Sequence, residues 1–234
     1  MKKNIFPTFV FFLALSIKSS IFALNLSPEE AKDELQNQYT LHCLLPSDIN
    51  EHLPTLRRIA SECQSVTELG VRNVVSSWGL IQGLSENPNL PHTFLGVDLG
   101  YPQPQVFELV KELTEANNIS FDFLQANDMH IDIEPVDFLF IDTLHTYAHL
   151  SYELEKFSTK ARKYIAMHDT SQTFEYRDCD SYKGDHSEYP AFIDRNKKGL
   201  WPAVEDFLAR HPEWVLHERY AHNNGLSILK RVSN

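Results

Sequence analysis

Residues that could carry chemistry gather in the segment 136–170. Asp142 directly follows the apolar run VDFLFI, and Asp169 closes a second largely apolar run, YIAMHD. His145 lies three residues after Asp142, and His168 directly precedes Asp169. Both runs have the composition of strands that are covered on both faces of a parallel sheet. Because ligands bind at the carboxyl ends of such strands, we expect the two carboxylates and an imidazole to face one crevice.

A second group of polar residues follows two earlier strands. Glu68 and Gly70 lie at the end of a strand predicted over 65–71, and Asp98 closes a strand predicted over 92–99. A glycine lets the backbone approach a ligand closely, and an acid at the second position commonly binds ribose hydroxyls. The full Gly-x-Gly-x-x-Gly motif is missing, which argues against a dinucleotide. The spacing alone leaves open a nucleotide-type ligand, or a tight turn at Gly70 with a helix cap at Asp98.

Strands and helices alternate through most of the chain. The further predicted strands are 119–126, 136–141 and 164–167, and the predicted helices are 74–84, 105–117, 149–160 and 201–210. This alternation predicts an α/β fold with a parallel sheet and crossover helices. Strands predicted over 214–220 and 226–230, joined by the turn Asn223-Asn224-Gly225, would close the sheet as an antiparallel hairpin.

Three segments stand outside the regular alternation of strands and helices and suggest how the chain is divided. Residues 1–23 combine the basic start MKKN with an apolar run over 5–17, which predicts a cleaved signal peptide and export; an uncleaved N-terminal anchor is the alternative. Residues 24–64, with helices predicted over 26–39 and 53–63, would form an N-terminal helical cap. The polar segment 171–199 leaves from the Asp169 strand end and is placed to fold over the crevice as a lid.

Composition excludes some function classes. The net charge of -11 comes without a basic stripe, so we expect no nucleic-acid partner. Three cysteines allow at most one disulfide bridge, which excludes a disulfide framework. The length and the hydrophobic fraction of 42% suit one α/β domain with a sizeable core.

Several short motifs together resemble a known family. FIDTLHTY (140–147) and MHDT (167–170) are accompanied by ELGVR (68–72) and GVDL (96–99). With these motifs the chain resembles the class I S-adenosylmethionine-dependent methyltransferases, and more narrowly the sugar- and catechol-type O-methyltransferases. The resemblance implies a Rossmann-like, seven-stranded, mostly parallel sheet with helices on both faces and an antiparallel C-terminal hairpin. The methyltransferase-like domain would span 65–234.

The resemblance also implies a binding site for S-adenosylmethionine. Glu68 and Gly70 would lie against the methionine part of the cofactor, and Asp98 would hold its ribose. Asn127 and Asp128, which follow the third strand, would border the adenine.

A metal site and a base are implied beside this cofactor site. Asp142 and Asp169 match positions that bind a divalent cation such as Mg²⁺ in metal-dependent members, and His145 matches the general base. Thr170 stands where catechol-type enzymes have an asparagine. The third ligand is therefore open between His149, His168, a loop acid and water.

The expected function is metal-assisted O-methylation of a small hydroxylated molecule, such as a sugar or a phenol. A divalent cation lowers the pKa of a hydroxyl, and a histidine with a near-neutral pKa can take the proton. Two other classes stay open. One is a non-catalytic exported protein that keeps the fold as a ligand- or partner-binding module, and the other is a metal-dependent hydrolase. Cofactor binding discriminates between these classes.

Overall fold

The computed structural model describes residues 26–179 and 189–232, so the expected signal peptide and the centre of the segment 171–199 lie outside the described residues. The strands are β1 (Ser65–Leu69), β2 (His92–Asp98), β3 (Ile119–Gln125), β4 (Val136–Ile141), β5 (Ala161–His168), β6 (Trp214–Tyr220) and β7 (Leu226–Arg231). The α-helices are α1 (Pro28–Leu44), α2 (Leu53–Ala60), α3 (Val75–Glu86), α4 (Pro104–Ala116), α5 (Tyr147–Phe157) and α6 (Leu200–Arg210). Short 3-10 turns are η1 (Asn50–His52), η2 (Asp128–His130) and η3 (Gln172–Phe174).

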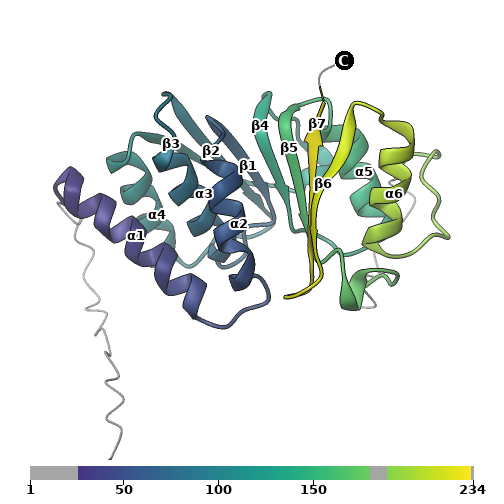
Figure 1. Cartoon of the computed structure of the whole chain (residues 1–234), viewed down its shortest axis with the longest axis horizontal. Coiled ribbons are helices and arrows are strands. Elements are labelled where there is room, and N and C mark those ends of the chain that lie inside the picture. Colours follow the sequence, from purple (N-terminus) through teal and green to yellow (C-terminus); the bar gives the residue numbers. More distant parts are fainter. Residues whose placement is uncertain (1–25, 180–188, 233–234) are drawn as a thin grey trace, which may run out of the picture.

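The strands form one seven-stranded sheet in the order β3-β2-β1-β4-β5-β7-β6 (Figure 1). Neighbours from β3 to β5 pair in parallel, whereas β7 is antiparallel to both β5 and β6. This arrangement confirms the predicted mostly parallel sheet with its C-terminal hairpin. It also confirms each predicted strand to within a few residues, β5 being the one that extends furthest beyond its predicted limits.

Helices cover both faces of the sheet, as predicted. Figure 1 shows α1 to α4 on one side and α5 with α6 on the other. One apolar core joins α1, α2, α3 and α4 to the sheet, with Leu35, Leu56 and Leu80 fully buried in it. A second core joins α5 and α6 to the opposite face, where Leu154 and Phe207 are fully buried. Every residue of β4 is buried, because this central strand is covered on both sides.

The N-terminal helices pack into the first of these cores rather than standing apart. α1 begins with a capping box, in which the Ser27 side chain accepts from the Glu30 backbone and Glu30 accepts from the Ser27 backbone. The helix continues to Leu44, beyond the predicted end at Tyr39. α2 lies against α3, and Gly83 of α3 lets the two backbones approach, since a Cβ there would lie 2.2 Å from the carbonyl oxygen of Arg57.

The order in which successive strands are added to the sheet reverses between β1 and β4, which are parallel neighbours. After β1 the sheet grows through β2 to β3, and after β4 it grows the other way through β5. The crevice of an open α/β sheet lies at such a switch point, at the carboxyl ends of the strands. Here Gly70 has φ +88°, and a Cβ on it would lie 2.0 Å from the carbonyl oxygen of Asp142. Glycine is therefore required to bring the ends of β1 and β4 together.

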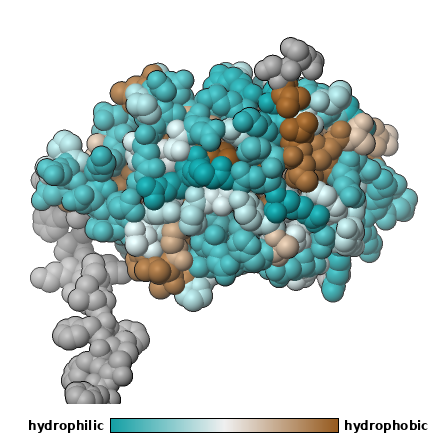
Figure 2. Space-filling model, in the orientation of Figure 1, coloured by the Kyte–Doolittle hydropathy of each residue, from teal (hydrophilic) through white to brown (hydrophobic). Residues whose placement is uncertain are grey.

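The face of the molecule seen in Figure 2 is mostly hydrophilic, with an apolar patch beside the C-terminal end of the described chain. In the C-terminal hairpin the exposed large apolar side chains are Val215 and Leu216 of β6 and Val232, which follows β7. Among residues 26–179 and 189–232, none of the helices has both the length and the apolar composition that crossing a bilayer requires. Cys43, Cys63 and Cys179 form no disulfide bridge in the described part of the chain.

Candidate functional site

Two aspartates and two histidines meet at the carboxyl ends of β4 and β5; we call them the strand-end cluster. Asp142 follows β4, and Asp169 follows β5 in the left-handed conformation with φ 58°. His145 Nε2 lies 3.4 Å from Asp142 Oδ1 and 3.0 Å from Asp169 Oδ2. His168 Nδ1 lies 3.4 Å from Asp142 Oδ2 and 3.1 Å from Asp169 Oδ2. The structure thus brings together the residues that the two strand ends predicted.

His168 is oriented by its other ring nitrogen. Its Nε2 lies 3.1 Å from the carbonyl oxygen of Asn223, an acceptor only, so this nitrogen carries a proton. Nδ1 is buried and lacks a hydrogen bond of good geometry within the described part of the chain, although it points between the two aspartates. Ligand atoms of Asp142, His168 and Asp169 all lie within 4.8 Å of one another. This donor set fits a divalent cation, and it favours His168 among the alternatives for the third ligand.

Charge explains why the four groups stay together when buried. Burial lowers the pKa of His145 and of His168, but the close contacts with Asp142 and Asp169 and the charges of these two aspartates outweigh burial and raise the pKa values to about 9 and about 10. Burial raises the pKa of both aspartates, but the two histidines lower it below the usual range. Two carboxylates therefore balance two imidazolium ions, and a divalent cation beside two neutral imidazoles would balance the same charge.

The described parts of the segment 171–199 contact His145. The Phe174 ring lies 4.5 Å from the His145 ring, centre to centre. The backbone N–H of Cys179 donates to the carbonyl oxygen of His145 at 2.8 Å. Asp178 Oδ1 accepts from the backbone of Tyr147 and of Gly199, each at 2.9 Å. The flanks of this segment therefore hold the base candidate in place, while the predicted lid role of its centre falls on residues outside the described ranges.

Glu68 has a different position from the one expected of a cofactor contact. Its side chain is fully buried, and its two oxygens accept hydrogen bonds from the hydroxyls of Ser76 and Ser77 on α3. Burial raises the pKa of Glu68 to about 8, opposed by the serine hydrogen bonds and assisted by the charges of Asp142 and Asp98. The residue ties α3 to β1, and contact with a cofactor stays a prediction.

Asp98 organises the loop between β1 and α3. Its Oδ2 accepts from the backbone N–H groups of Val71 and Arg72, and its Oδ1 accepts from Gly100. Oδ1 keeps a lone pair, so it can accept one more hydrogen bond, for example from a ribose hydroxyl. In the same loop Val74 has φ 66°, a strained conformation for a β-branched residue. Such strain is concentrated at ligand-binding sites.

Asn127 and Asp128 follow β3 as predicted but face different surroundings. Asn127 Oδ1 accepts from the backbone of Met129 at 2.9 Å and caps the short turn η2. Asp128 is 8% exposed and turns inward, where its Oδ2 lies 3.1 Å from His149 Nε2. The expectation that both residues border an adenine stays a prediction. The contact between Asp128 and His149 was not predicted from the sequence.

The sequence matches no protein-family model and no curated protein. Solved structures are similar in fold. A protein from Corynebacterium glutamicum shares 13% identity with a TM-score of 0.52, covering 87% of this chain and 90% of that chain. The methyltransferase PaMTH1 from Podospora anserina, solved with SAH, shares 12% identity with a TM-score of 0.48, covering 88% of each chain. An O-methyltransferase from Bacillus cereus, in complex with SAH, shares 14% identity with a TM-score of 0.48, covering 86% of this chain and 90% of that chain. At these identities, the likeness to the Corynebacterium protein shows the fold alone.

Proposed function

We propose that the chain is an S-adenosylmethionine-dependent O-methyltransferase that acts on a small hydroxylated molecule with the help of a divalent cation. The observation that carries this proposal is the strand-end cluster. In it a base candidate, His145, lies beside two carboxylates at the carboxyl ends of β4 and β5, next to the switch point between β1 and β4. Ligands bind at this point in open α/β sheets, and the combination of hard oxygen ligands with an imidazole suits the activation of a hydroxyl.

The cofactor would lie along the neighbouring strand ends. Asp98 has one lone pair left for a ribose hydroxyl, and Asn127 lies after β3, the strand paired with β2. S-adenosylmethionine would supply the methyl group as an electrophile on its sulfonium. Gly70 keeps the end of β1 within reach of Asp142, so cofactor and acceptor sites would share one crevice. Glu68 would act on this site indirectly, by holding α3 against β1.

The residues of the cluster would divide the work on the acceptor. Asp142 and Asp169, with His168, would hold the cation, whose charge would lower the pKa of the acceptor hydroxyl. Without a cation the two aspartates keep a proton on His145, whose pKa is about 9. A bound cation would replace that proton, and the neutral His145 would then accept the hydroxyl proton on Nε2, the nitrogen that faces both aspartates. Phe174, packed on the His145 ring, would limit the motion of the base and exclude water from one side of it.

We also propose that residues 1–23 direct export, because they combine a basic start with an apolar run and a small residue, Ala23, at the end. An exported enzyme meets its cofactor only where the cofactor is present, for example in the cytosol of another cell. Fractionation of cells that express the full chain tests the proposal. A product lacking residues 1–23 outside the cytoplasm supports it, and an uncleaved chain in the cytosolic fraction contradicts it.

The activity is tested with S-adenosylmethionine that carries a labelled methyl group. The purified protein is incubated with a panel of catechols and monosaccharides, with Mg²⁺ or with a chelator. We expect label in at least one acceptor with Mg²⁺, and at least about 10-fold less with the chelator. Label that transfers equally with the chelator would remove the cation from the proposal. Esters and phosphoesters are incubated in parallel without cofactor, and their hydrolysis would favour the hydrolase instead.

A further inference from the structure

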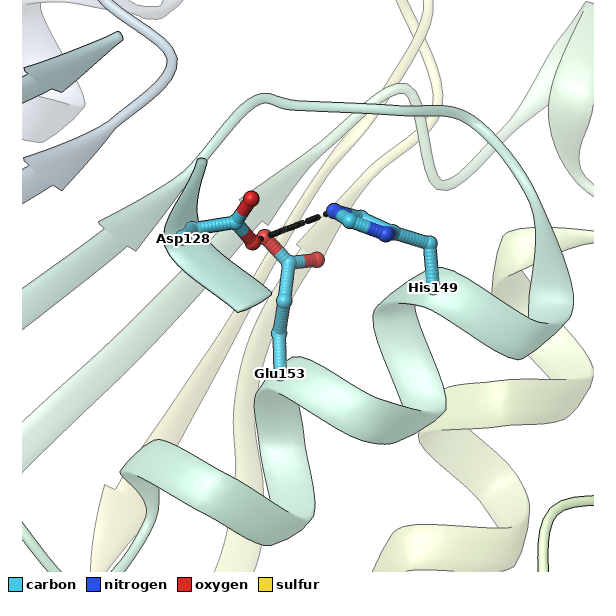
Figure 3. Close-up of side chains that lie close together, drawn as sticks. All are labelled: Asp128, His149 and Glu153. Atoms are coloured by element: carbon cyan, nitrogen blue, oxygen red, sulfur yellow. Dashed lines mark ion pairs between the residues drawn. The ribbon is translucent and has the colours of Figure 1, made fainter. Parts of the chain in front are cut away.

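A second group of potential ligands lies between η2 and α5, separate from the strand-end cluster. Asp128 comes from η2, and His149 and Glu153 come from successive turns of α5; we call these three residues the buried triad. Figure 3 shows the side chains of His149 and Glu153 projecting from one face of α5 toward Asp128. His149 Nε2 lies 3.1 Å from Asp128 Oδ2 and 3.7 Å from Glu153 Oε1. The exposed fractions are 8% for Asp128, 5% for His149 and 0% for Glu153.

Two carboxylate oxygens of the buried triad lack hydrogen bonds within the described part of the chain. These are Glu153 Oε2 and Asp128 Oδ2, both shielded from solvent. Glu153 Oε1 accepts from the Thr143 hydroxyl at 2.7 Å. Burial raises the pKa of both carboxyl groups, but His149 lowers the pKa of Asp128 below its usual range, whereas the charge of Asp128 raises the pKa of Glu153 further. Two carboxylates so close and so deeply buried still need a compensating positive charge, which a proton held within the triad or a bound cation would provide.

Contacts behind the triad fix its members in place. Tyr189 Oη lies 3.0 Å from His149 Nδ1, which leaves Nε2 facing the carboxylates. Lys156 Nζ donates to the carbonyl oxygens of Asp128 and Met129, each at 2.8 Å, and so holds η2 against α5. Metal-binding histidines and carboxylates in proteins are oriented by outer contacts of this kind.

We propose that Asp128, His149 and Glu153 bind a divalent transition-metal ion of the zinc class through one imidazole nitrogen and two carboxylate oxygens. The three ligand atoms lie within 4.8 Å of one another. A tetrahedral zinc ion with bonds of about 2.0 Å has ligands about 3.3 Å apart, close to the 3.1 and 3.7 Å found here. Imidazole favours zinc over Mg²⁺ and Ca²⁺, and two carboxylates neutralise its charge.

The position of the triad points to a structural role for this ion. It would join η2, which follows β3, to α5, which begins just after Asp142 and His145. The three side chains are at most 8% exposed, so a substrate has little access to them, and the ion would stabilise the fold rather than act on a substrate.

The test separates the triad from the strand-end cluster. The full-length chain carrying Asp142→Asn and Asp169→Asn is stripped with a chelator and titrated with zinc chloride by calorimetry. We expect one zinc ion per chain, counted by elemental analysis, and a thermal midpoint that rises with zinc. Adding Glu153→Gln should weaken zinc binding at least about 100-fold and abolish the shift, since a neutral amide is a poor zinc ligand. Adding Glu155→Gln, on the same helix but paired with Arg210 at the surface, should change neither.

Folding and metal loss are distinguished by further readouts. The amide that Glu153→Gln introduces has the size of the carboxylate and can keep the hydrogen bond from Thr143, so the metal-free variant should melt close to its metal-free parent. Co²⁺ should give visible absorption bands in the parent, and Glu153→Gln should remove them. The proposal is overturned if the parent binds no zinc, or if Glu153→Gln binds zinc as tightly as the parent.

Discussion

His145 Nε2 lies 3.0 Å from Asp169 Oδ2, although the two residues belong to different strand ends. The contact forms because β4 and β5 are parallel neighbours and end at the same edge of the sheet. The left-handed backbone of Asp169 turns its carboxylate toward His145. This pair is the geometric centre of the proposed methyltransferase site.

Replacing His145 tests its role as the base. His145→Ala should lower the rate of methyl transfer by about 100-fold or more, the usual contribution of a general base, and leave the affinity for S-adenosylmethionine within about twofold. Rates come from labelled methyl transfer, and affinity comes from calorimetry. His217→Ala, on the edge strand β6, is the matched control and should behave like the wild-type protein. Wild-type turnover in His145→Ala would exclude His145 as the base.

Gly70 should be essential for stability independently of any ligand. A Cβ at this position would lie 2.0 Å from the Asp142 carbonyl oxygen, and φ is +88°. We expect Gly70→Ala to lower the free energy of unfolding by about 2–4 kcal/mol, from the strained backbone and the overlap together. Urea denaturation measures the change. Gly100→Ala is the control, because a Cβ there has nothing within 4 Å; equal stabilities of the two variants would refute the steric argument.

Glu68 should make the stability of the protein depend on pH. Its pKa is raised from 4.5 to about 8 in the folded state, so between these values the folded protein holds a proton that the unfolded chain has lost. The stabilisation is complete below the unfolded pKa of 4.5 and is lost as the pH rises through about 8. Over that range it falls by at most about 1.4 kcal/mol per pH unit. Glu68→Gln should remove this part of the slope.

The measurement is urea denaturation at several pH values between the two pKa values of Glu68. The difference between the wild-type protein and Glu68→Gln isolates the contribution of Glu68 from that of other titrating groups. Glu108→Gln, at an exposed position on α4, serves as the control and should keep the wild-type slope. Parallel slopes for the wild-type protein and Glu68→Gln would show that Glu68 is ionised in the folded state at these pH values.

The sequence predicted the sheet and the strand-end cluster for the same physical reason. An almost wholly apolar run such as 136–141 must be a strand covered on both faces, and parallel strands end at one edge. Asp142 and Asp169 therefore had to meet once β4 and β5 were neighbours. The orientation of His168 was not predictable, because it depends on Asn223, which lies far along the chain in the turn before β7.

The buried triad shows where sequence reasoning fell short. The helix was predicted from His149, but it begins at Tyr147, because the Thr146 hydroxyl caps it by accepting from the His149 backbone. His149 and Glu153 are one turn apart and share a face, a spacing visible in the sequence. A fully buried glutamate on a helix is rare, so the sequence alone did not single out Glu153 as a partner of His149. Likewise, nothing local indicated that Ser76 and Ser77 would enclose Glu68.

Binding of S-adenosylmethionine tests the central claim most directly. Calorimetry of the purified protein should detect cofactor binding, and Asp98→Ala should weaken it by about 10- to 100-fold, as expected for loss of a hydrogen bond to a charged group. Asp122→Ala, an exposed aspartate on the adjacent strand β3, should bind like the wild-type protein. Thermal melting checks that each variant is folded. The absence of any binding by the folded wild-type protein at millimolar cofactor would contradict the account and favour a non-catalytic binding module.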